Sequence, residues 1–315
     1  MTGTEAAAVA GQRPGPGGSR DLVGYGGFWP RLTWPNGARL AVSVNINLEE
    51  GAEWQVGDGD PASERIGEVV SVVEPGTRDM GQEQIFAYGT RAGFWRILEA
   101  LRERGLAATW LCCGRAVERS PALLGAVVGD GHEAAVHGWR WRPHADYRSR
   151  EAEAADLDRC IAVMEAAGAA RPVGFFCRGA ESAWTRGLLI ERGFLYTSNA
   201  FDDDLPYWDR SGTRPLLVVP YALDANDMKF FHPNGFVTAD AMAAYVADSL
   251  EVLLAEAERG RPRLLNLGFH LRIVGRPGRF AALTRILDRL RDLGDRIYVG
   301  TRADIARSFA ASVPA

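Results

Sequence analysis

The sequence has few cysteines, and their spacing argues against the usual cysteine-based sites. There are four in 315 residues, and none belongs to a C-x-x-C pair. Cys112 and Cys113 are adjacent in the chain, a spacing that suits disulfide geometry poorly. We therefore expect Cys112, Cys113, Cys160 and Cys177 to be buried, reduced thiols rather than a disulfide framework or a zinc site.

Long apolar runs and an excess of positive charge are also absent. No apolar segment approaches the roughly 20 residues needed to span a bilayer, and the first residues lack the basic start and apolar core of a secretory signal. The formal net charge of -4 gives no field that would attract nucleic acid or an anionic membrane. These absences favour a cytoplasmic protein with a small-molecule substrate, and with neither nucleic acid nor a membrane as a partner.

What is present is an alternation of apolar strands and amphipathic helices, in a globular composition that is 47% hydrophobic and 24% charged. The alternation predicts an α/β fold with a parallel sheet, and the even composition favours one closed or nearly closed barrel. The Gly- and Pro-rich residues 1–22 are expected to form a flexible arm, and 23–315 a single barrel domain. Expected strands cover 39–48, 107–114, 132–138, 173–178, 194–199, 215–221, 263–270 and 296–300, and the longer expected helices cover 88–106, 149–168, 238–259 and 279–293.

Between the first strand and the first helix, residues 51–87 are rich in Gly, Pro and charged residues. A loop of that length in a compact domain is usually functional. We expect it to cover the active site or to contact a neighbouring subunit.

Polar side chains stand at the ends of four expected strands. Glu49 and Glu50 follow the first strand, His137 and Arg178 end two middle strands, and His270 ends the last long one. Active sites of α/β barrels lie at the C-terminal strand ends, so this convergence predicts a catalytic mouth. Each position also has a structural interpretation: a solvated loop start for the glutamates, a core hydrogen bond for a histidine, and a surface position for the arginine.

The order of several motifs resembles the polysaccharide deacetylase superfamily, whose shared unit is the NodB homology domain. The resemblance runs from about residue 24 to 309 and implies an irregular (β/α)7 barrel, in agreement with the alternation of strands and helices. Three of the motifs are specific to the branch of cofactor-independent allantoinases and cyclic imide hydrolases. The motifs are NLEEG, YGTRAGFW, GHEAAVHGWRW and the three branch-specific ones, DDDLPYW, DANDM and HLRIVGRPGR.

Two family motifs carry the chemistry. In the parent family, T-F-D-D-G supplies a base and a metal ligand, and the matching stretch here places Glu49 at the base position and Glu50 at the ligand position. H-[ST]-x-x-H supplies two more ligands, and here it begins with His137 but ends with Trp141. An indole has no lone pair for a cation, and a catalytic zinc normally holds three protein ligands. The resemblance therefore implies no metal and no other cofactor, with His144 left open as a replacement ligand.

A third motif departs from the family pattern. Residues 174–182 read GFFCRGAES, whereas allantoinases resemble G-W-Y-T-G-R-x-S-P, so Arg and Gly are exchanged and the proline is missing. This stretch helps to line the pocket in the family. The resemblance thus implies C–N hydrolysis without pointing to allantoin itself as the substrate.

The resemblance implies an amidohydrolase that opens a cyclic amide, ureide or imide. Glu49 is the expected general base, with a pKa raised toward neutral by burial against a tryptophan and by Glu50. His137 is expected to help stabilise the oxyanion, and His270 to protonate the leaving nitrogen. The expected substrate-binding residues are Glu50, Trp139, Trp141, Arg178, Tyr207, Trp208, Asn226 and Asp227.

Two other functions stay open on the sequence alone. One is a metal-dependent N- or O-deacetylase of an amino sugar or a specialised metabolite, and the other is a non-catalytic member of the family. The resemblance also implies a homo-oligomer, either a dimer or a tetramer.

Overall fold

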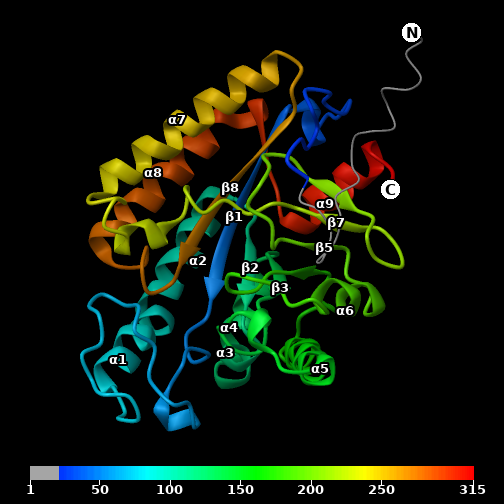
Figure 1. Ribbon diagram of the computed structural model, residues 1–315. Helices are drawn as coiled ribbons and strands as arrows, with labels where there is room; N and C mark the ends of the chain where they lie inside the picture. The colour runs from blue at the N-terminus through cyan, green and yellow to red at the C-terminus, as the bar shows by residue number, and fades with distance from the viewer. Residues whose placement is uncertain (1–20) are drawn as a thin grey trace.

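Two long parallel strands form the centre of the fold. In the computed structural model, which describes residues 21–315, β1 (Leu40–Leu48) pairs with β8 (Arg263–His270) from Leu40 opposite Arg263 to Asn47 opposite His270. Every residue of both strands is buried, as expected for parallel strands covered on both faces. Figure 1 shows them as two long arrows whose C-terminal ends point toward the same end of the molecule.

Shorter strands extend this pair into a curled, mostly parallel sheet. They are β2 (Thr109–Cys112), β3 (Glu133–Val136), β4 (Gly174–Phe175), β5 (Tyr196–Thr197), β6 (Tyr207–Asp209), β7 (Leu216–Val218) and β9 (Ile297–Val299). The order across the sheet is β6-β7-β5-β4-β3-β2-β1-β8, with β9 also paired to β1, and only the edge strand β6 pairs antiparallel among the described strands. A bridge between Asn226 and Gly268 brings the segment after β7 beside β8. The irregular barrel predicted from the sequence is thereby confirmed.

Helices cover the outer face of this sheet. In Figure 1, α7 (Ala239–Glu258) and α8 (Pro277–Leu293) lie side by side along β1 and β8. The other α-helices are α1 (Met80–Tyr88), α2 (Phe94–Arg104), α3 (Gly114–Arg119), α4 (Pro121–Gly129), α5 (Arg150–Ala166), α6 (Thr185–Glu191) and α9 (Arg302–Ser312). Short 3-10 helices cover Pro35–Gly37, Val56–Asp58, His144–Asp146, Asp227–Phe231 and Gly294–Arg296, and a π-helix covers Gly89–Gly93.

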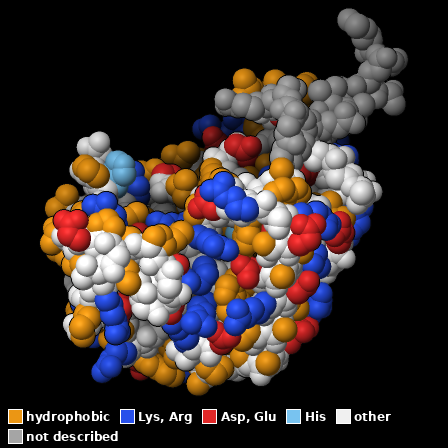
Figure 2. All heavy atoms as spheres, turned by 60° about the horizontal axis from the view of Figure 1, so that its bottom comes forward, with side chains coloured by type: hydrophobic (Ala, Val, Ile, Leu, Met, Phe, Trp, Pro, Cys, Tyr) orange, Lys and Arg blue, Asp and Glu red, His pale blue; other side chains and the backbone are white. Residues whose placement is uncertain are grey.

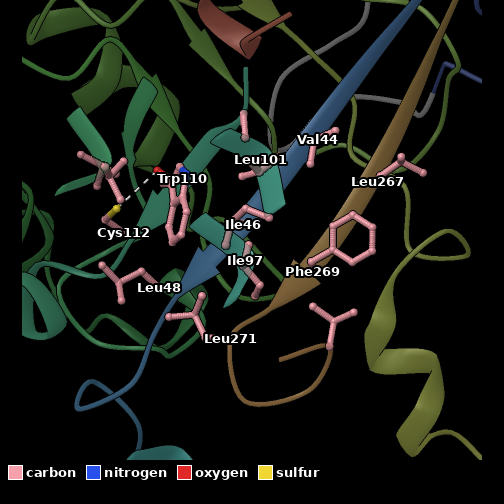
Figure 3. Close-up of a cluster of buried hydrophobic side chains, with 14 of the residues drawn as sticks. Val44, Ile46, Leu48, Ile97, Leu101, Trp110, Cys112, Leu267, Phe269 and Leu271 are labelled. Carbon is pink, nitrogen blue, oxygen red and sulfur yellow. Dashed lines mark hydrogen bonds between the residues drawn. The ribbon is translucent and has the colours of Figure 1, made fainter. Parts of the chain in front are cut away.

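The alternation of side chains along β1 separates two environments. Val44, Ile46 and Leu48 point outward and pack with side chains of α2, β2 and β8 in the main hydrophobic core, drawn in Figure 3. The alternate residues Asn45 and Asn47 are also buried, although they are polar. Because successive side chains of a strand face opposite sides of the sheet, the barrel interior is polar where its outer layer is apolar.

Arg302, the first residue of α9, fills part of this polar interior. It is fully buried and donates to Ser198 Oγ at 2.8 Å, to Asn266 Oδ1, and to the carbonyl oxygens of Val219 and Pro220. The last helix of the chain therefore supplies hydrogen-bond donors to segments from several parts of the barrel. These bonds satisfy polar groups that would otherwise be buried without partners.

The expected long loop over residues 51–87 is shorter than predicted. Asp79 caps α1 by accepting from Gln82 N, and α1 continues through the π-helix Gly89–Gly93 into α2. Gly89 and Gly93 permit this close packing, because a Cβ would lie 2.5 Å from Glu50 Oε1 at the first and 2.0 Å from Leu271 O at the second. The sequence prediction missed α1 because its first turns follow a Gly- and Pro-rich stretch.

Two expectations from the sequence concern cysteines and membranes. All four cysteines are buried and unpaired, as predicted. Within residues 21–315, none of the helices has the length and apolar character required to cross a membrane. The flexible arm expected over 1–22 lies, up to residue 20, outside the described residues.

Candidate active site

A cavity of about 820 Å³ opens where the strands end. Its buried part is lined by Glu49, His137 and His270, and its more exposed part by residues of the segments 65–70 and 223–232. Figure 2, turned to bring this end of the molecule forward, shows Lys and Arg side chains near the middle of the face, among hydrophobic ones. The structure thus brings the three expected catalytic residues together in one cavity.

Glu49 is the centre of a buried polar cluster. Its Oε1 lies 3.1 Å from His137 Nε2 and 3.3 Å from His270 Nε2, and its Oε2 accepts from Arg272 Nη1 at 2.7 Å. The side chain is almost entirely excluded from solvent. A single carboxylate therefore faces two imidazoles and a guanidinium.

The other nitrogen of each imidazole is held by an oxygen acceptor. His270 Nδ1 lies 2.6 Å from Asp227 Oδ1, while Asp227 Oδ2 accepts from the backbone N–H groups of His270 and Val274. His137 Nδ1 lies 3.2 Å from Phe176 O. These contacts fix both rings so that Nε2 points at Glu49, in the way that a second group commonly orients a catalytic histidine.

The electrostatics of the cluster assign opposite protonation states to Glu49 and His270. Burial raises the pKa of Glu49, but the charges of His270 and Arg272 and hydrogen bonds from His137 and His270 hold it well below its usual range. Burial lowers the pKa of His270, but Glu49 and Asp227 raise it to about 9. The expected upward shift of the Glu49 pKa was therefore wrong, because adjacent positive charge outweighs desolvation.

Glu50 lies behind the cavity rather than in its lining. Its Oε2 accepts from Glu49 N at 3.1 Å, and its Oε1 accepts from Arg272 N at 3.2 Å. Burial raises its pKa to about 7, and the lowering effect of Arg272 is partly cancelled by Glu49. The expectation that Glu50 contacts substrate is corrected: adjacent strand-end residues point to opposite sides, and this one faces the backbone.

Arg272 is the main residue that sequence reasoning missed. It is fully buried, and its guanidinium lies 4.3 Å from the ring centroid of Phe86 and 4.7 Å from that of Trp141. Its Nη1 is 2.7 Å from Glu49 Oε2 and 3.5 Å from Glu50 Oε1. Its position two residues after His270, in the HLRIVGRPGR motif, could have indicated that it lies near the site. The apolar strand pattern ends at His270, however, and therefore did not predict where the Arg272 side chain points.

Trp141 and Arg178 line the cavity together. The Arg178 guanidinium lies 3.7 Å from the Trp141 ring centroid, and its Nη1 is 2.7 Å from Glu64 Oε2. Glu64 is itself buried and belongs to the segment between β1 and α1. Arg178 thus links this segment to the cavity wall. Its guanidinium is already paired with a carboxylate of the protein, that of Glu64.

Three residues expected to bind substrate lie elsewhere. Trp139 packs between α3 and α5, with the guanidinium of Arg159 3.7 Å from its ring centroid. Tyr207 and Trp208 lie on the edge strand β6, where Trp208 Nε1 donates to Val313 O at 2.7 Å. The HGWRW turn separates Trp139 from Trp141, and neither Tyr207 nor Trp208 is among the residues that line the cavity. By contrast, Asn226 lines the cavity. Asp227 does not line it but contacts His270, which does.

The residues at the family's metal position do not fit a metal ion. Trp141 offers no lone pair, and a cation at Glu50 would lie beside the Arg272 guanidinium. Both histidines direct Nε2 at Glu49, and His144 lies apart from them, with its Nδ1 2.8 Å from Glu153 Oε1. Over residues 21–315, no group of three or more His, Cys, Asp or Glu side chains is arranged to hold a metal.

A buried carboxylate with two oriented imidazoles in a cavity at the strand ends has the groups that acid–base chemistry requires. The family model described as polysaccharide deacetylase matches residues 82–188. A Schizosaccharomyces pombe protein whose name places it among the polysaccharide deacetylases is 32% identical over 94% of this chain and 98% of its own length. The chain therefore belongs to the polysaccharide deacetylase family, and it is a hydrolase that acts on C–N bonds other than peptide bonds.

Two solved structures show the same architecture at higher identity. A probable polysaccharide deacetylase from Pseudomonas aeruginosa PAO1 is 38% identical, with a TM-score of 0.89 over 95% of this chain and 100% of its own. A Puue allantoinase is 37% identical, with a TM-score of 0.88 over 95% of this chain and 99% of its own. These matches confirm the family resemblance and are consistent with the allantoinase-like branch.

Proposed function

We propose that the protein opens a cyclic amide, ureide or imide by hydrolysis that needs no metal ion. The observation that carries this proposal is the Arg272 guanidinium, a positive charge of the chain itself that contacts both Glu49 and Glu50. The 37% identity to an allantoinase over nearly the whole chain supports the same class of substrate. Ring amides and ureides under strain are easier targets than open-chain acetamides, which suits a site without a Lewis acid.

Glu49 is the proposed general base. Its low pKa keeps it ionised at neutral pH, so it can take a proton from a water molecule that attacks the ring carbonyl. Its contact with Arg272 orients the carboxylate and lowers its basicity. General base catalysis of this kind contributes about 10²–10⁴-fold to the rate.

His270 is the proposed general acid. Its pKa of about 9 leaves it protonated at neutral pH, and Asp227 holds its ring so that Nε2 faces the reacting centre. When the C–N bond breaks, the electron pair stays on nitrogen and the His270 proton is transferred to it. His137, on the other side of Glu49, is the proposed hydrogen-bond donor to the oxyanion of the tetrahedral intermediate.

The test is a substrate panel run with and without a chelator. It compares succinimide, dihydrouracil and allantoin with N-acetylglucosamine oligomers, and the metal content of the purified protein is measured in parallel. We expect ring opening that the chelator leaves unchanged. Zinc-dependent deacetylation of the sugars alone would instead establish the metal-dependent deacetylase. No turnover of any substrate would favour a non-catalytic family member.

Two further predictions from the sequence concern the setting of the enzyme. The homo-oligomer implied by the resemblance and the cytoplasmic location stay predictions. Analytical ultracentrifugation of the purified protein tests the first, and fractionation of the producing cells tests the second.

A further inference from the structure

A network of three polar side chains forms one wall of the cavity beside the catalytic cluster. Asn47 lies near the end of β1, while Tyr221 and Asn226 belong to the segment after β7, and all three line the cavity and are buried. Tyr221 Oη accepts from Asn47 Nδ2 at 3.3 Å and from Asn226 Nδ2 at 3.1 Å. Nothing in the acid–base steps above uses this network.

The orientation of both amides is fixed by the backbone. Asn47 Nδ2 also donates to Phe269 O at 3.0 Å, and Asn226 Oδ1 accepts from Met228 N at 2.8 Å. Two N–H groups therefore point at Tyr221 Oη, which must direct its own hydrogen elsewhere. Asn47 Oδ1 has no hydrogen-bond partner within residues 21–315, although it is buried.

The wall thus has one unused acceptor, on Asn47, and one unused donor, on Tyr221. A buried acceptor without a partner is costly, and in native structures it commonly marks a place that a ligand or water satisfies. Asn47 lies opposite His270 in the pairing of β1 with β8 and two residues before Glu49. The two unused groups are therefore next to the proposed acid and base.

Neighbouring donor and acceptor groups match the edge of an amide that is cis. In a five- or six-membered ring the amide is held cis, so its N–H and C=O lie on the same edge. In an open-chain acetamide the trans form is strongly preferred, and the two groups point in opposite directions. A wall with an acceptor beside a donor can therefore engage both groups of a ring amide, but only one of an acetamido group.

We propose that Asn47 and Tyr221 read the N–H/C=O edge of a ring amide whose nitrogen carries hydrogen. This inference rests on the proposed function and names its substrate class as cyclic amides, ureides and imides unsubstituted at the scissile nitrogen. Asn47 Oδ1 accepts the ring N–H, and the Tyr221 hydroxyl donates to the carbonyl oxygen that becomes the oxyanion.

Glu49, Tyr221 and His270 account for every proton that moves in the hydrolysis. Water adds its oxygen to the carbonyl carbon and gives one proton to Glu49, while Tyr221 donates a hydrogen bond to the oxyanion. The C–N bond then breaks, nitrogen keeps the electron pair, and the His270 proton completes an NH₂ group. The product is a carboxylic acid tethered to an amide, urea or amine.

The ring stack next to this wall suits a flat substrate. Phe176 lies nearly parallel to Tyr221, with centroids 4.5 Å apart and planes at 20°, and nearly parallel to His137, with centroids 5.1 Å apart and planes at 17°. Phe176 also lines the cavity. A planar ring can lie along this wall while its edge meets Asn47 and Tyr221.

The experiment compares succinimide with N-methylsuccinimide, which lacks the N–H group. For the wild-type protein we expect kcat/KM to be about 100-fold higher for succinimide, because the methyl group leaves Asn47 Oδ1 unpaired and meets it sterically. In Asn47→Ala this ratio should fall below about 5-fold, since the acceptor is gone and the methyl group has space. Asn45→Ala, on the same strand but away from the cavity, should keep the wild-type ratio whatever its effect on stability.

Tyr221→Phe tests the donor. We expect kcat for succinimide to fall about 100-fold with KM within a factor of about three, because the hydroxyl acts on the oxyanion. An unchanged kcat in this variant, or a wild-type ratio near one, would overturn the inference while leaving ring hydrolysis intact. Absence of any ring opening by the wild-type protein would instead overturn the proposed function, and this inference with it. The ratio of kcat/KM for succinimide to that for N-methylsuccinimide in the wild-type protein tests the inference even if Asn47→Ala does not fold.

Discussion

Arg272 Nη1 lies 2.7 Å from Glu49 Oε2 in a fully buried ion pair. The same guanidinium approaches Glu50 and lies against Phe86 and Trp141. A positive charge that belongs to the chain thus stands beside the candidate base. Its presence helps to account for a Glu49 pKa below the usual range despite complete burial.

Replacing Glu49 should remove most of the activity. Glu49→Gln keeps the size of the side chain but cannot take a proton, so we expect kcat to fall by about 10³-fold. Steady-state kinetics on an active ring substrate measures this. Glu83→Gln, on the exposed pair with Arg78, is the matched control and should retain wild-type kcat. A Glu49→Gln enzyme with full turnover would show that another group is the base.

Removing the buried guanidinium should affect both stability and the pH profile. Arg272→Met leaves Glu49 and Glu50 without their cation, and breaking a buried ion pair costs about 3–5 kcal/mol. Because Arg272 lowers the pKa of Glu49, the acidic limb of kcat/KM should move to higher pH. Denaturant unfolding and a pH series of kcat/KM measure the two effects. Arg272→Lys keeps the charge and should lie between the wild type and Arg272→Met, and an unmoved acidic limb in Arg272→Met would contradict the electrostatic role.

The alkaline limb should report on His270. This group must be protonated to act as the acid, so kcat/KM should fall as the pH rises through about 9. Asp227 contributes to raising that pKa, so Asp227→Asn should move the limb to lower pH. The pH dependence of kcat/KM in both proteins checks this. Identical alkaline limbs would show that Asp227 does not affect the pKa of the group that titrates there.

Restoring the missing ligand should not by itself create a zinc site. Trp141→His returns an imidazole to the second motif, but the Arg272 charge beside Glu50 still opposes a cation. We expect metal analysis after zinc incubation and desalting to find far less than one equivalent in Trp141→His. The double variant Trp141→His/Arg272→Ala should bind more, and stoichiometric zinc in the single variant would show that the guanidinium does not exclude metal.

The link between Arg178 and Glu64 should affect substrate binding more than chemistry. Arg178→Gln breaks this partly buried pair and loosens the segment between β1 and α1 over the cavity. We expect KM to rise about 5–20-fold with kcat nearly unchanged, because uniform binding is lost. Steady-state kinetics with Arg178→Gln and Glu64→Gln measures this, and both should behave alike. A loss confined to kcat would place Arg178 in the chemical step.

Residues at the strand ends could be predicted from the sequence better than residues in the loops after them. Glu49, His137 and His270 each end or follow a strand with a clear apolar pattern, and parallel strands bring such ends to one edge. Arg272 lies in a loop, where the direction of a side chain depends on backbone turns that no periodicity records. Tyr221 ends the strand expected over 215–221, but β7 stops at Val218, so the strand pattern did not give the direction of its side chain. That both side chains reach the site could therefore be seen only in the structure. The same is true of the Asn47 Oδ1 atom that has no hydrogen-bond partner within residues 21–315.

The aromatic residues near the motifs were the hardest to place. Trp139 and Trp141 are two positions apart in one turn, yet one packs between helices and the other lines the cavity. Tyr207 and Trp208 belong to a branch-specific motif whose composition does not say which way its side chains face. In this chain they pack at the sheet edge, where Trp208 bonds to the C-terminal segment.

The position of Arg302 has a consequence for biosynthesis. Its donors reach Ser198, Asn266 and the carbonyl oxygens after β7, so they meet partners made long before it. A nascent chain that has not yet reached residue 302 contains those acceptors without their guanidinium. The polar interior of the barrel can therefore complete its hydrogen bonds only after Arg302 has left the ribosome, late in synthesis.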